Sequence, residues 1–272
     1  MKISVIIPTY NREKLLKKTL DSVLNQTVQA DEIIIIDDGS IDNTKQLINS
    51  YSTTIIKYIL QKNSGVSNAR NNGIKKAKNK WICFLDSDDI WEKEKLEKQI
   101  QFHKNNPHIL FSHTDELWLF NGKIIKQKKH QLKPSGFCFE HNIPNTLIGA
   151  STVMIHKKLF DDIGYFDETL IACEDYDLWL RILSHYELGL IDQKLIHKIA
   201  GHQNQLSFST KMMDVYRIKA LQKHTNCFSH HHAIKKEIIK KCDILIKGAQ
   251  KHHNKEIEKY YTQLKMLSTN WI

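Results

Sequence analysis

The stretch Glu32-Ile33-Ile34-Ile35-Ile36-Asp37-Asp38-Gly39-Ser40 decides the fold class of this chain. Four successive isoleucines are typical of a parallel strand covered on both faces, because such a strand has no solvent-facing side that would alternate with polar residues. The run stops at two aspartates followed by glycine and serine, which are residues typical of a turn. We therefore predict a central buried strand over residues 32–36, with acidic side chains at its carboxyl end.

The segments around this strand alternate between strand and helix patterns. Short apolar runs predict strands, whereas apolar residues at helical spacing predict helices. Asn11 is the expected N-cap of the first helix. The alternation predicts an α/β fold with a Rossmann-like, mostly parallel sheet and helices on both faces. The other predicted strands are residues 2–8, 54–60 and 81–85, and the helices are residues 13–24, 43–50, 66–77 and 93–105.

The pattern becomes mixed after about residue 106. Two apolar segments flank Asn121-Gly122, a pair typical of tight hairpins, so antiparallel strands are expected there. Beyond Ser209 the apolar residues fall on helical stripes. We therefore predict one domain over residues 1–208, with a nucleotide-binding half over about 1–106 and an acceptor half over about 107–208, and a basic helical C-terminal extension over 209–272. The predicted elements of the second half are strands 110–120, 123–125, 152–156 and 187–191 and a helix at 175–185.

Three of the predicted strands end in polar clusters, at residues 9–11, 37–40 and 86–89. Ligands of open α/β sheets bind beyond the carboxyl ends of the strands, so these clusters should converge on one crevice. Asp86, Asp88 and Asp89 lie within four residues of one another. Oxygen ligands of this kind suit Mg²⁺ or Mn²⁺, which usually bind one or two carboxylates together with substrate phosphates. The cluster therefore indicates a site for a metal-bound phosphate ester.

Two further acids, Glu174 and Asp175, stand at the start of the predicted helix at 175–185. Carboxylates stabilise a helix start through the macrodipole, so capping explains them as readily as general-base catalysis does. Trp179 lies one turn later on the same helix. Its ring is a candidate for stacking on an acceptor sugar, and core packing is the alternative.

The charge of the chain is uneven. The 272 residues carry a formal charge of +10, and residues 205–272 hold 13 Lys and Arg against 5 Asp and Glu. This tail is either the solvated face of helices or a contact with an anionic membrane surface. No apolar run approaches the ~20 residues of a spanning helix, and no signal peptide precedes the first strand, so we expect a cytoplasmic protein, peripheral on the inner membrane face if the tail binds lipid. Five scattered cysteines argue against a disulfide framework or a zinc site.

The ordered motifs resemble those of inverting, bacterial-type family 2 glycosyltransferases with the GT-A fold. The resemblance extends over residues 2–210 and implies a nucleotide-sugar donor, most simply a UDP-sugar. It implies that Thr9 and Asp38 contact the base and that Arg70 lies near the nucleotide. The matching segments are SVIIPTYNR (4–12), IIIIDDGSIDNT (33–44), NSGVSNARNNGI (63–74), FLDSDDIW (84–91) and IGYFDETLIACEDYDLWLRI (163–182).

The same resemblance assigns roles to the candidate residues. The catalytic base would be Asp175 of the pair Glu174-Asp175, and a cofactor of Mn²⁺ or Mg²⁺ would assist the departing diphosphate. His202 is a further candidate for the metal or diphosphate, and a bystander role is the alternative. The nucleotide-binding residues implied are Pro8, Thr9, Tyr10, Asp38, Arg70, Asp86 and Ser87; the metal residues are Asp88, Asp86, Asp89 and His202; and the acceptor residue is Trp179.

The expected reaction is non-processive, because the Q-x-x-R-W motif and membrane helices of processive members are absent. A hexosyl or N-acetylhexosaminyl group would pass to a hydroxyl of a cell-surface glycan or lipid-linked saccharide. A pyrophosphorylase or a dehydrogenase would need a glycine-rich loop where this chain has Pro8-Thr9-Tyr10-Asn11. A nucleic-acid-binding protein would suit the sequence pI of 9.2 but not the acids at the strand ends, so no nucleic-acid partner is expected. A catalytically inactive nucleotide-sugar binder remains an alternative.

Overall fold

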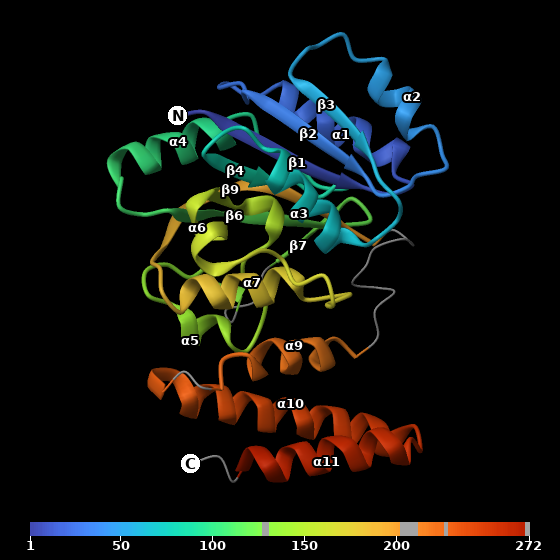
Figure 1. The fold of residues 1–272 in the computed structure, drawn as a ribbon, viewed down its shortest axis with the longest axis vertical. Helices are drawn as coiled ribbons and strands as arrows, with labels where there is room; N and C mark the ends of the chain where they lie inside the picture. Colours follow the sequence, from blue (N-terminus) through green and yellow to red (C-terminus); the bar gives the residue numbers. More distant parts are fainter. Residues whose placement is uncertain (127–130, 202–211, 226–227, 270–272) are drawn as a thin grey trace.

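The structure is a computed structural model that describes residues 1–126, 131–201, 212–225 and 228–269. Within these residues the chain forms a nine-stranded mixed sheet in the order β3-β2-β1-β4-β8-β6-β9-β5, and β7 pairs with β6 (Figure 1). The strands are β1 Ile3–Thr9, β2 Glu32–Asp37, β3 Ile56–Leu60, β4 Trp81–Phe84, β5 Ile90–Trp91, β6 Phe111–Phe120, β7 Lys123–Ile125, β8 Met154–His156 and β9 Leu188–Ala200. The helices are α1 Glu13–Leu24, α2 Thr44–Asn49, α3 Val66–Lys76, α4 Lys95–Asn105, α5 Phe139–Asn142, α6 Lys158–Ile163, α7 Glu174–Leu183, α9 Met213–Gln222, α10 His231–Lys251 and α11 Lys255–Thr269.

The first four main strands form the parallel part of the sheet, as the sequence predicts. Strand β1 lies between β2 and β4 and is parallel to both, and β3 extends the parallel part beyond β2. The isoleucines of β2 are all buried, but they enter two different apolar clusters. Ile33 and Ile35 pack on one side of the sheet, and Ile34 and Ile36 pack on the other. This division explains why the strand is apolar without interruption.

The second half of the sheet is mixed. Strand β8 is antiparallel to β4 and β6, whereas β6 and β9 run parallel to each other. The hairpin at Asn121-Gly122 is confirmed: both residues have positive φ, as a two-residue hairpin turn requires, and β6 and β7 pair across it. Strand β9 continues to Ala200, well beyond the predicted end at Ile191. Three exposed residues, 192–194, interrupt its apolar pattern and hid this extension.

Asn11 is not the N-cap of α1, contrary to the prediction. It adopts a left-handed conformation with a φ of 50°, and the N-cap position belongs to Arg12, whose side chain makes no capping bond. The Asn11 side-chain oxygen instead accepts a hydrogen bond from the Ile41 N–H at 2.9 Å, and the Asn11 N–H donates to Ser40 Oγ at 2.8 Å. Asn11 therefore ties the loop after β1 to the loop after β2.

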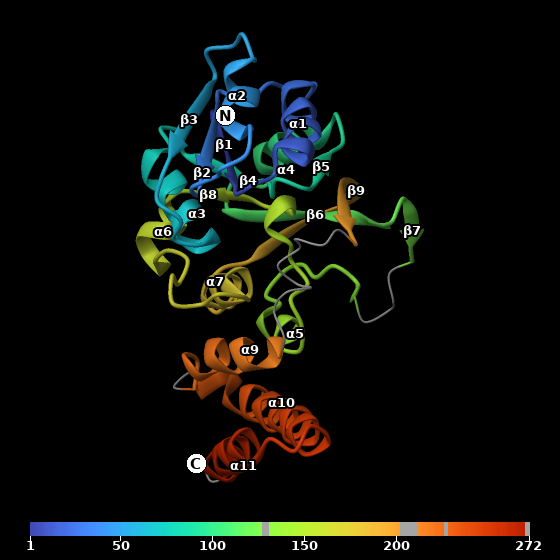
Figure 2. The ribbon, with the colours of Figure 1, turned by 90° about the vertical axis from the view of Figure 1, so that its right-hand side faces the viewer.

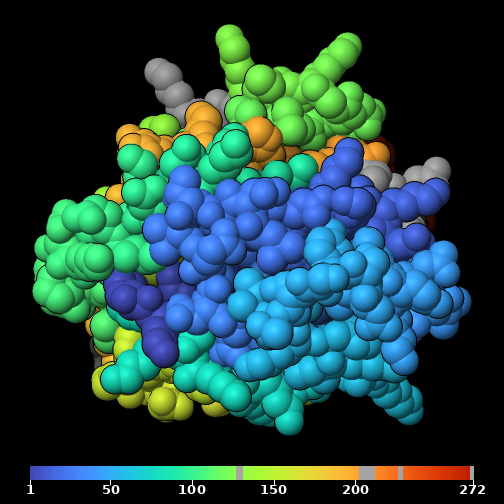
Figure 3. All heavy atoms as spheres, turned by 90° about the horizontal axis from the view of Figure 1, so that it is seen from above, coloured from blue at the N-terminus to red at the C-terminus, as the bar shows by residue number. Residues whose placement is uncertain are grey.

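The C-terminal helices α9, α10 and α11 stack beneath α7, at the far end of the molecule from the parallel strands (Figures 1 and 2). Their apolar residues Ile218, Ile234 and Ile238 belong to the same buried cluster as Tyr176 and Leu183 of α7. The N-terminal part of the chain, in blue, covers much of the opposite face (Figure 3). The helical tail is thus packed on the sheet domain, and the predicted boundary at residue 208 lies outside the described residues.

Candidate functional site

A pocket of about 850 Å³ opens at the carboxyl ends of β1, β2 and β4. The three polar strand ends do converge there, as the polarity of the strands predicts: residues 8–12, Asp38 and residues 86–89 all line it. The start of α3, the loop before α7 and Lys198 of β9 complete the wall. The predicted site residues that line this pocket are Pro8, Thr9, Tyr10, Asp38, Arg70, Asp86, Ser87, Asp88, Asp89, Glu174 and Asp175.

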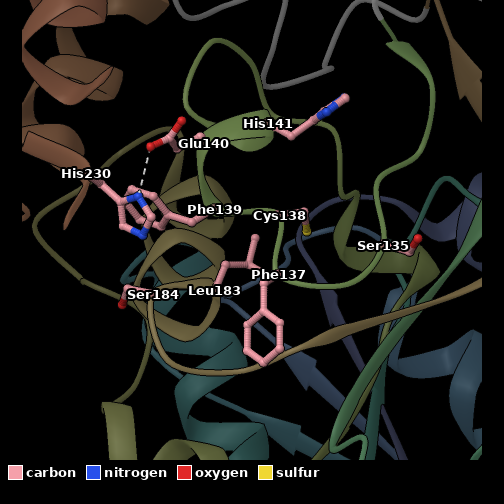
Figure 4. Close-up of a pocket in the computed structure, with 9 residues that line it drawn as sticks. All are labelled: Ser135, Phe137, Cys138, Phe139, Glu140, His141, Leu183, Ser184 and His230. Carbon is pink, nitrogen blue, oxygen red and sulfur yellow. Dashed lines mark hydrogen bonds and ion pairs between the residues drawn. The ribbon is translucent and has the colours of Figure 1, made fainter. Parts of the chain in front are cut away.

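A smaller pocket of about 400 Å³ lies elsewhere, between α5, the end of α7 and the start of α10 (Figure 4). Its single acid, Glu140, faces His230 with its carboxylate 3.0 Å from the ring Nδ1, and the His230 ring stacks on Phe139. These contacts join the sheet domain to the C-terminal helices. Because this pocket holds none of the converging strand ends, the larger pocket is the candidate functional site.

Asp38 is held at the floor of the larger pocket by the loop that precedes α3. Its carboxylate accepts hydrogen bonds from the N–H groups of Ser64 and Gly65, at 2.9 and 2.8 Å, and from the Gln61 amide at 2.7 Å. The side chain is buried and its position is fixed by these donors. Thr9 lies beside the same crevice, and its buried hydroxyl has no hydrogen-bond partner among the described residues. Such a buried polar atom in a pocket wall is suited to bind a ligand.

Arg70 links the two acidic regions of the pocket. Its guanidinium is buried and bonds to Asp86 and to Glu174, at 2.6 Å in both cases. The guanidinium also lies 5.3 Å from the centre of the Phe166 ring. Burial acts to raise the pKa of Asp86, but the charges of Arg70, Lys198 and Arg12 and the hydrogen bond from Arg70 together lower it. Arg70 therefore joins the end of β4 to the start of α7 through the two ion pairs of its buried guanidinium.

Asn71, next to Arg70, connects α3 to the loop before α7 through hydrogen bonds. Its amide donates to the Phe166 carbonyl and to Glu168, and its oxygen accepts a bond from the Phe166 N–H at 3.0 Å. Gly73 allows α3 to lie against β1, because a Cβ at this position would overlap the side chain of Ile6. These residues position the loop before α7 over the pocket, a role that sequence reasoning did not assign.

The acidic cluster after β4 is divided between structural and pocket-facing roles. Asp89 is buried; it accepts the Ser151 hydroxyl at 2.6 Å and the Ile199 N–H at 3.3 Å, so it joins the cluster to β9. Burial, with Asp88 and Asp86 nearby, raises the pKa of Asp89 well above its usual value, against the lowering effect of Lys198. Asp88 lies 3.6 Å from Arg12.

The donor set fits a partial metal site. Among the described residues, no three His, Cys, Asp or Glu side chains gather closely enough to bind a metal by themselves. A magnesium or manganese ion at the substrate phosphates needs only one or two carboxylates, and Asp88 with Asp86 can supply these oxygens. Asp89 fits less well, because Ser151 and β9 already occupy its oxygens. His202 lies outside the described residues.

Asp175 also lines the pocket, at the start of α7. Cys173, the residue before the helix, has a φ of 61° in the left-handed region, and the two acids follow it directly. Burial and the neighbouring Glu174 carboxylate raise the pKa of Asp175 to about 7, against the lowering effect of Arg70 and Lys198. A carboxylate with this pKa can accept a proton near neutral pH, which is what a general base requires.

Trp179 does not take the position expected of a residue that stacks on the acceptor sugar. Only 2% of the residue is exposed, its indole N–H donates to the Ile148 carbonyl at 3.1 Å, and its ring packs on Phe111 and Phe166. It does not line the pocket. The helix turns this face toward the core, because α7 must cover the sheet there, so the alternative of core packing is the correct one.

Lys198 and Arg12 are pocket residues to which sequence reasoning assigned no role in the site. Lys198 and Arg12 line the pocket, and Ser151 bonds to the Asp86 N–H as well as to Asp89. Lys198 falls in the unpredicted extension of β9, so no pattern pointed to it.

The mixed α/β sheet, the acids beyond its parallel strands and the second acidic pair in the same pocket match the arrangement that the resemblance to GT-A glycosyltransferases implies. The comparisons agree: residues 4–155 match the family model described as Glycosyl transferase family 2. A structure of Staphylococcus aureus TarS 1–349 in complex with UDP-GlcNAc covers 97% of this chain and 92% of its own, with a TM-score of 0.67 and 19% identity, and so has the same fold. The chain belongs to glycosyl transferase family 2.

Curated relatives extend this similarity. A protein of Rickettsia felis named "Uncharacterized glycosyltransferase" is 40% identical over 206 residues, which are 75% of this chain and 34% of the relative. The chain thus spans about a third of that protein's length. An Escherichia coli protein named "UDP-Glc:alpha-D-GlcNAc-diphosphoundecaprenol beta-1,3-glucosyltransferase WfgD" is 33% identical over 192 residues, which are 70% of this chain and 73% of the relative.

A search of the described helices for a membrane span finds none that is both long and apolar enough.

Proposed function

We propose that this protein transfers a sugar from a UDP-sugar to an acceptor hydroxyl with inversion at the anomeric carbon. The observation that carries the proposal is the convergence of the family motifs on one pocket of about 850 Å³. The size suits a nucleotide sugar, because small-molecule sites measure about 300–1,000 Å³. The E. coli relative, whose name specifies a UDP-glucose donor, supports the choice of nucleotide.

The nucleotide end of the donor would lie over β1 and β2. Asp38 and Thr9 would contact the base, with Pro8 and Tyr10 beside them. Asp38 fits this role because its carboxylate is buried and oriented by backbone N–H groups, so a ligand N–H can replace the amide donor of Gln61 without moving the acid. Asp86 and Ser87 would lie near the ribose, and Arg70 would hold Asp86 in place.

Asp175 would act as the general base. It would take the proton of the acceptor hydroxyl as that oxygen forms its bond to the anomeric carbon, and the bond from this carbon to the diphosphate breaks with its electron pair leaving on the diphosphate. One attack from the face opposite the leaving group inverts the configuration. Glu174 would not take the proton, because its carboxylate is bonded to Arg70 at 2.6 Å. Its role would be to hold the start of α7 and to keep the pKa of Asp175 high.

Asp88, with Asp86, would hold Mn²⁺ or Mg²⁺. When bound there, the ion would neutralise negative charge that grows on the leaving diphosphate. Asp89 would support this arrangement through Ser151 and β9 rather than by direct coordination. His202 remains a proposed further ligand.

The experiment that tests this function measures nucleotide release from a panel of UDP-, GDP- and dTDP-sugars in the presence of Mn²⁺. We expect release of UDP from at least one UDP-sugar by the wild type, and a loss of release after addition of EDTA. Asp88→Asn should weaken the response to Mn²⁺, whereas Lys158→Gln, which changes an exposed lysine of α6, should not. Release from no donor, or equal release by the wild type with and without the metal, would contradict the proposal.

The acceptor would be a cell-surface glycan or a lipid-linked saccharide, and the basic tail would bring the protein to an anionic membrane. The tail has an exposed basic face on α10, although Lys241 is buried and paired with Asp214 and Glu237. We expect binding to vesicles that contain anionic lipid, lost at high salt. Charge reversal of the exposed lysines should abolish vesicle binding; equal binding of this variant and the wild type would remove the membrane role. The exposed lysines are Lys236, Lys240, Lys247 and Lys251.

A further inference from the structure

Lys198 places a positive charge inside the acidic pocket from the strand that the sequence did not predict. It belongs to β9 and lines the pocket next to the acids that follow β4. Its Nζ lies 5.1 Å from the centre of the Trp118 ring on the neighbouring strand β6. A Cβ at Gly149 would lie 3.5 Å from the same Nζ, so the backbone of the Gly149 turn bounds the ammonium on another side.

The acids around Lys198 explain why it stays charged. Burial disfavours the ammonium, but Glu116 behind it and Asp89, Asp86 and Asp175 in front raise its pKa above the ordinary lysine value. Glu116 also accepts hydrogen bonds from Lys133 at 2.7 Å and from the Trp118 N–H at 3.0 Å, both at its Oε1. The charge of Lys198 is therefore balanced at a distance rather than in one close pair.

The charge of the pocket creates a need for such a cation. Seven carboxylates and three cationic side chains line it, a formal charge of −4, whereas a nucleotide diphosphate adds two more negative charges. Arg70 is bonded to Asp86 and Glu174, and Arg12 lies 3.6 Å from Asp88. Within the described part of the chain, Lys198 alone of the three forms no ion pair within 4 Å. Its N–H groups are thus the ones that a substrate oxygen can use without breaking a close pair.

We propose that Lys198 binds the diphosphate of the nucleotide-sugar donor, so that the leaving group is held between this ammonium and the acidic cluster after β4. The inference rests on the proposed function, because it assumes that the pocket takes a nucleotide sugar. It assigns a binding residue that the motifs do not contain. It also explains the extension of β9 to Ala200, because Lys198 lies in this extension and its ammonium lines the pocket.

The test compares UDP with uridine as probes, titrated calorimetrically in the presence of Mn²⁺. Lys198→Met removes the charge at nearly constant length. We expect it to weaken UDP binding about 10- to 100-fold, as for the loss of one charge-assisted hydrogen bond, and to leave uridine binding unchanged. Lys194→Met is the matched control, because Lys194 lies on the same strand but is exposed and faces Asp115 outside the pocket. This control should bind both probes like the wild type.

Three outcomes separate the possibilities. Wild type that binds neither UDP nor uridine refutes the proposed function itself. If the wild type and Lys198→Met bind UDP equally well, only the role of Lys198 is refuted. A similar loss for UDP and uridine assigns Lys198 a structural role and also overturns the inference. If Lys198→Met does not fold, Lys198→Gln takes its place, and Lys198→Arg should retain UDP affinity within a few-fold of wild type because it keeps the charge.

Discussion

Neutralising Glu174 is expected to move the pH dependence of sugar transfer to lower pH. Asp175 must be ionised to accept a proton, and burial together with the Glu174 carboxylate raises its pKa to about 7. The rate of the wild type should therefore rise about tenfold per pH unit through the acid range and level off near pH 7. Glu174→Gln removes the negative neighbour and leaves Arg70 with one carboxylate partner instead of two. Both changes favour ionised Asp175.

The magnitude follows from the separation of adjacent side chains. Two unit charges about 10 Å apart at an effective dielectric constant of about 20 interact by about 1.7 kcal/mol, which corresponds to about one pH unit. Glu174 and Asp175 are consecutive residues at the start of α7, and for a separation of about 10 Å between their carboxylates the midpoint should fall by about one unit. The substitution also weakens a buried pair, so stability must be measured in parallel.

The assay is the initial rate of UDP release at saturating donor between pH 5 and 8.5, with thermal unfolding followed at each pH. Asp162→Asn is the control, because this exposed acid of α6 pairs with Lys158 far from the pocket. Its profile should coincide with that of the wild type. A rate that does not change between pH 5 and 7 in the wild type, or a midpoint that Glu174→Gln leaves in place, would refute the assignment of Asp175 as the titrating base.

The remaining predictions concern single side chains. Asp175→Asn should lower turnover about 10²- to 10⁴-fold with UDP affinity unchanged in calorimetry, and an equal loss of UDP binding would contradict its role as base. Arg70→Met should destabilise the fold by about 3–5 kcal/mol in denaturant titration, because Asp86 and Glu174 lose their buried partner; a loss below about 1 kcal/mol would show that the pairs contribute little. Gly73→Ala should destabilise by about 1–3 kcal/mol through overlap with Ile6, and an unchanged denaturation midpoint would show that α3 can shift without cost. Lys95 is buried and its pKa is lowered to about 8, so burial of its ammonium lowers the free energy of unfolding by the full amount below pH 8 and by less as pH rises toward 10.5. The stability of the wild type relative to Lys95→Met should therefore rise over that interval. A constant difference would contradict the pKa shift.

The parallel half of the fold was predictable because its strands and helices carry uninterrupted periodic patterns. Helix α1 begins and ends at the predicted residues, and the isoleucines of β2 correctly predict a strand that is buried on both faces. The hairpin at Asn121-Gly122 was equally clear, since the turn chemistry is specific. The sequence was sufficient to predict an element wherever its own apolar pattern or turn residues specify its conformation.

The pocket could be predicted only in part. Strand polarity brought the acids of β2 and β4 together, but the far extension of β9 was hidden by the exposed residues 192–194, so Lys198 could not be placed. Trp179 and Asn11 show the reverse error: their residue types suit a sugar contact and an N-cap, and tertiary packing assigns them to the core and to a loop contact. Long-range partners decide such residues, and a single sequence does not specify them.

The central claim is that this pocket binds a nucleotide diphosphate with the help of a metal at Asp88. Calorimetric titration of UDP into the wild-type protein, with Mn²⁺ and then with EDTA in its place, tests it most directly. The account predicts binding with Mn²⁺ that is at least tenfold weaker with EDTA, and an Asp88→Asn variant whose UDP affinity no longer depends on the metal. UDP affinity that is the same with and without Mn²⁺ in the wild type, or no UDP binding under either condition, would contradict it.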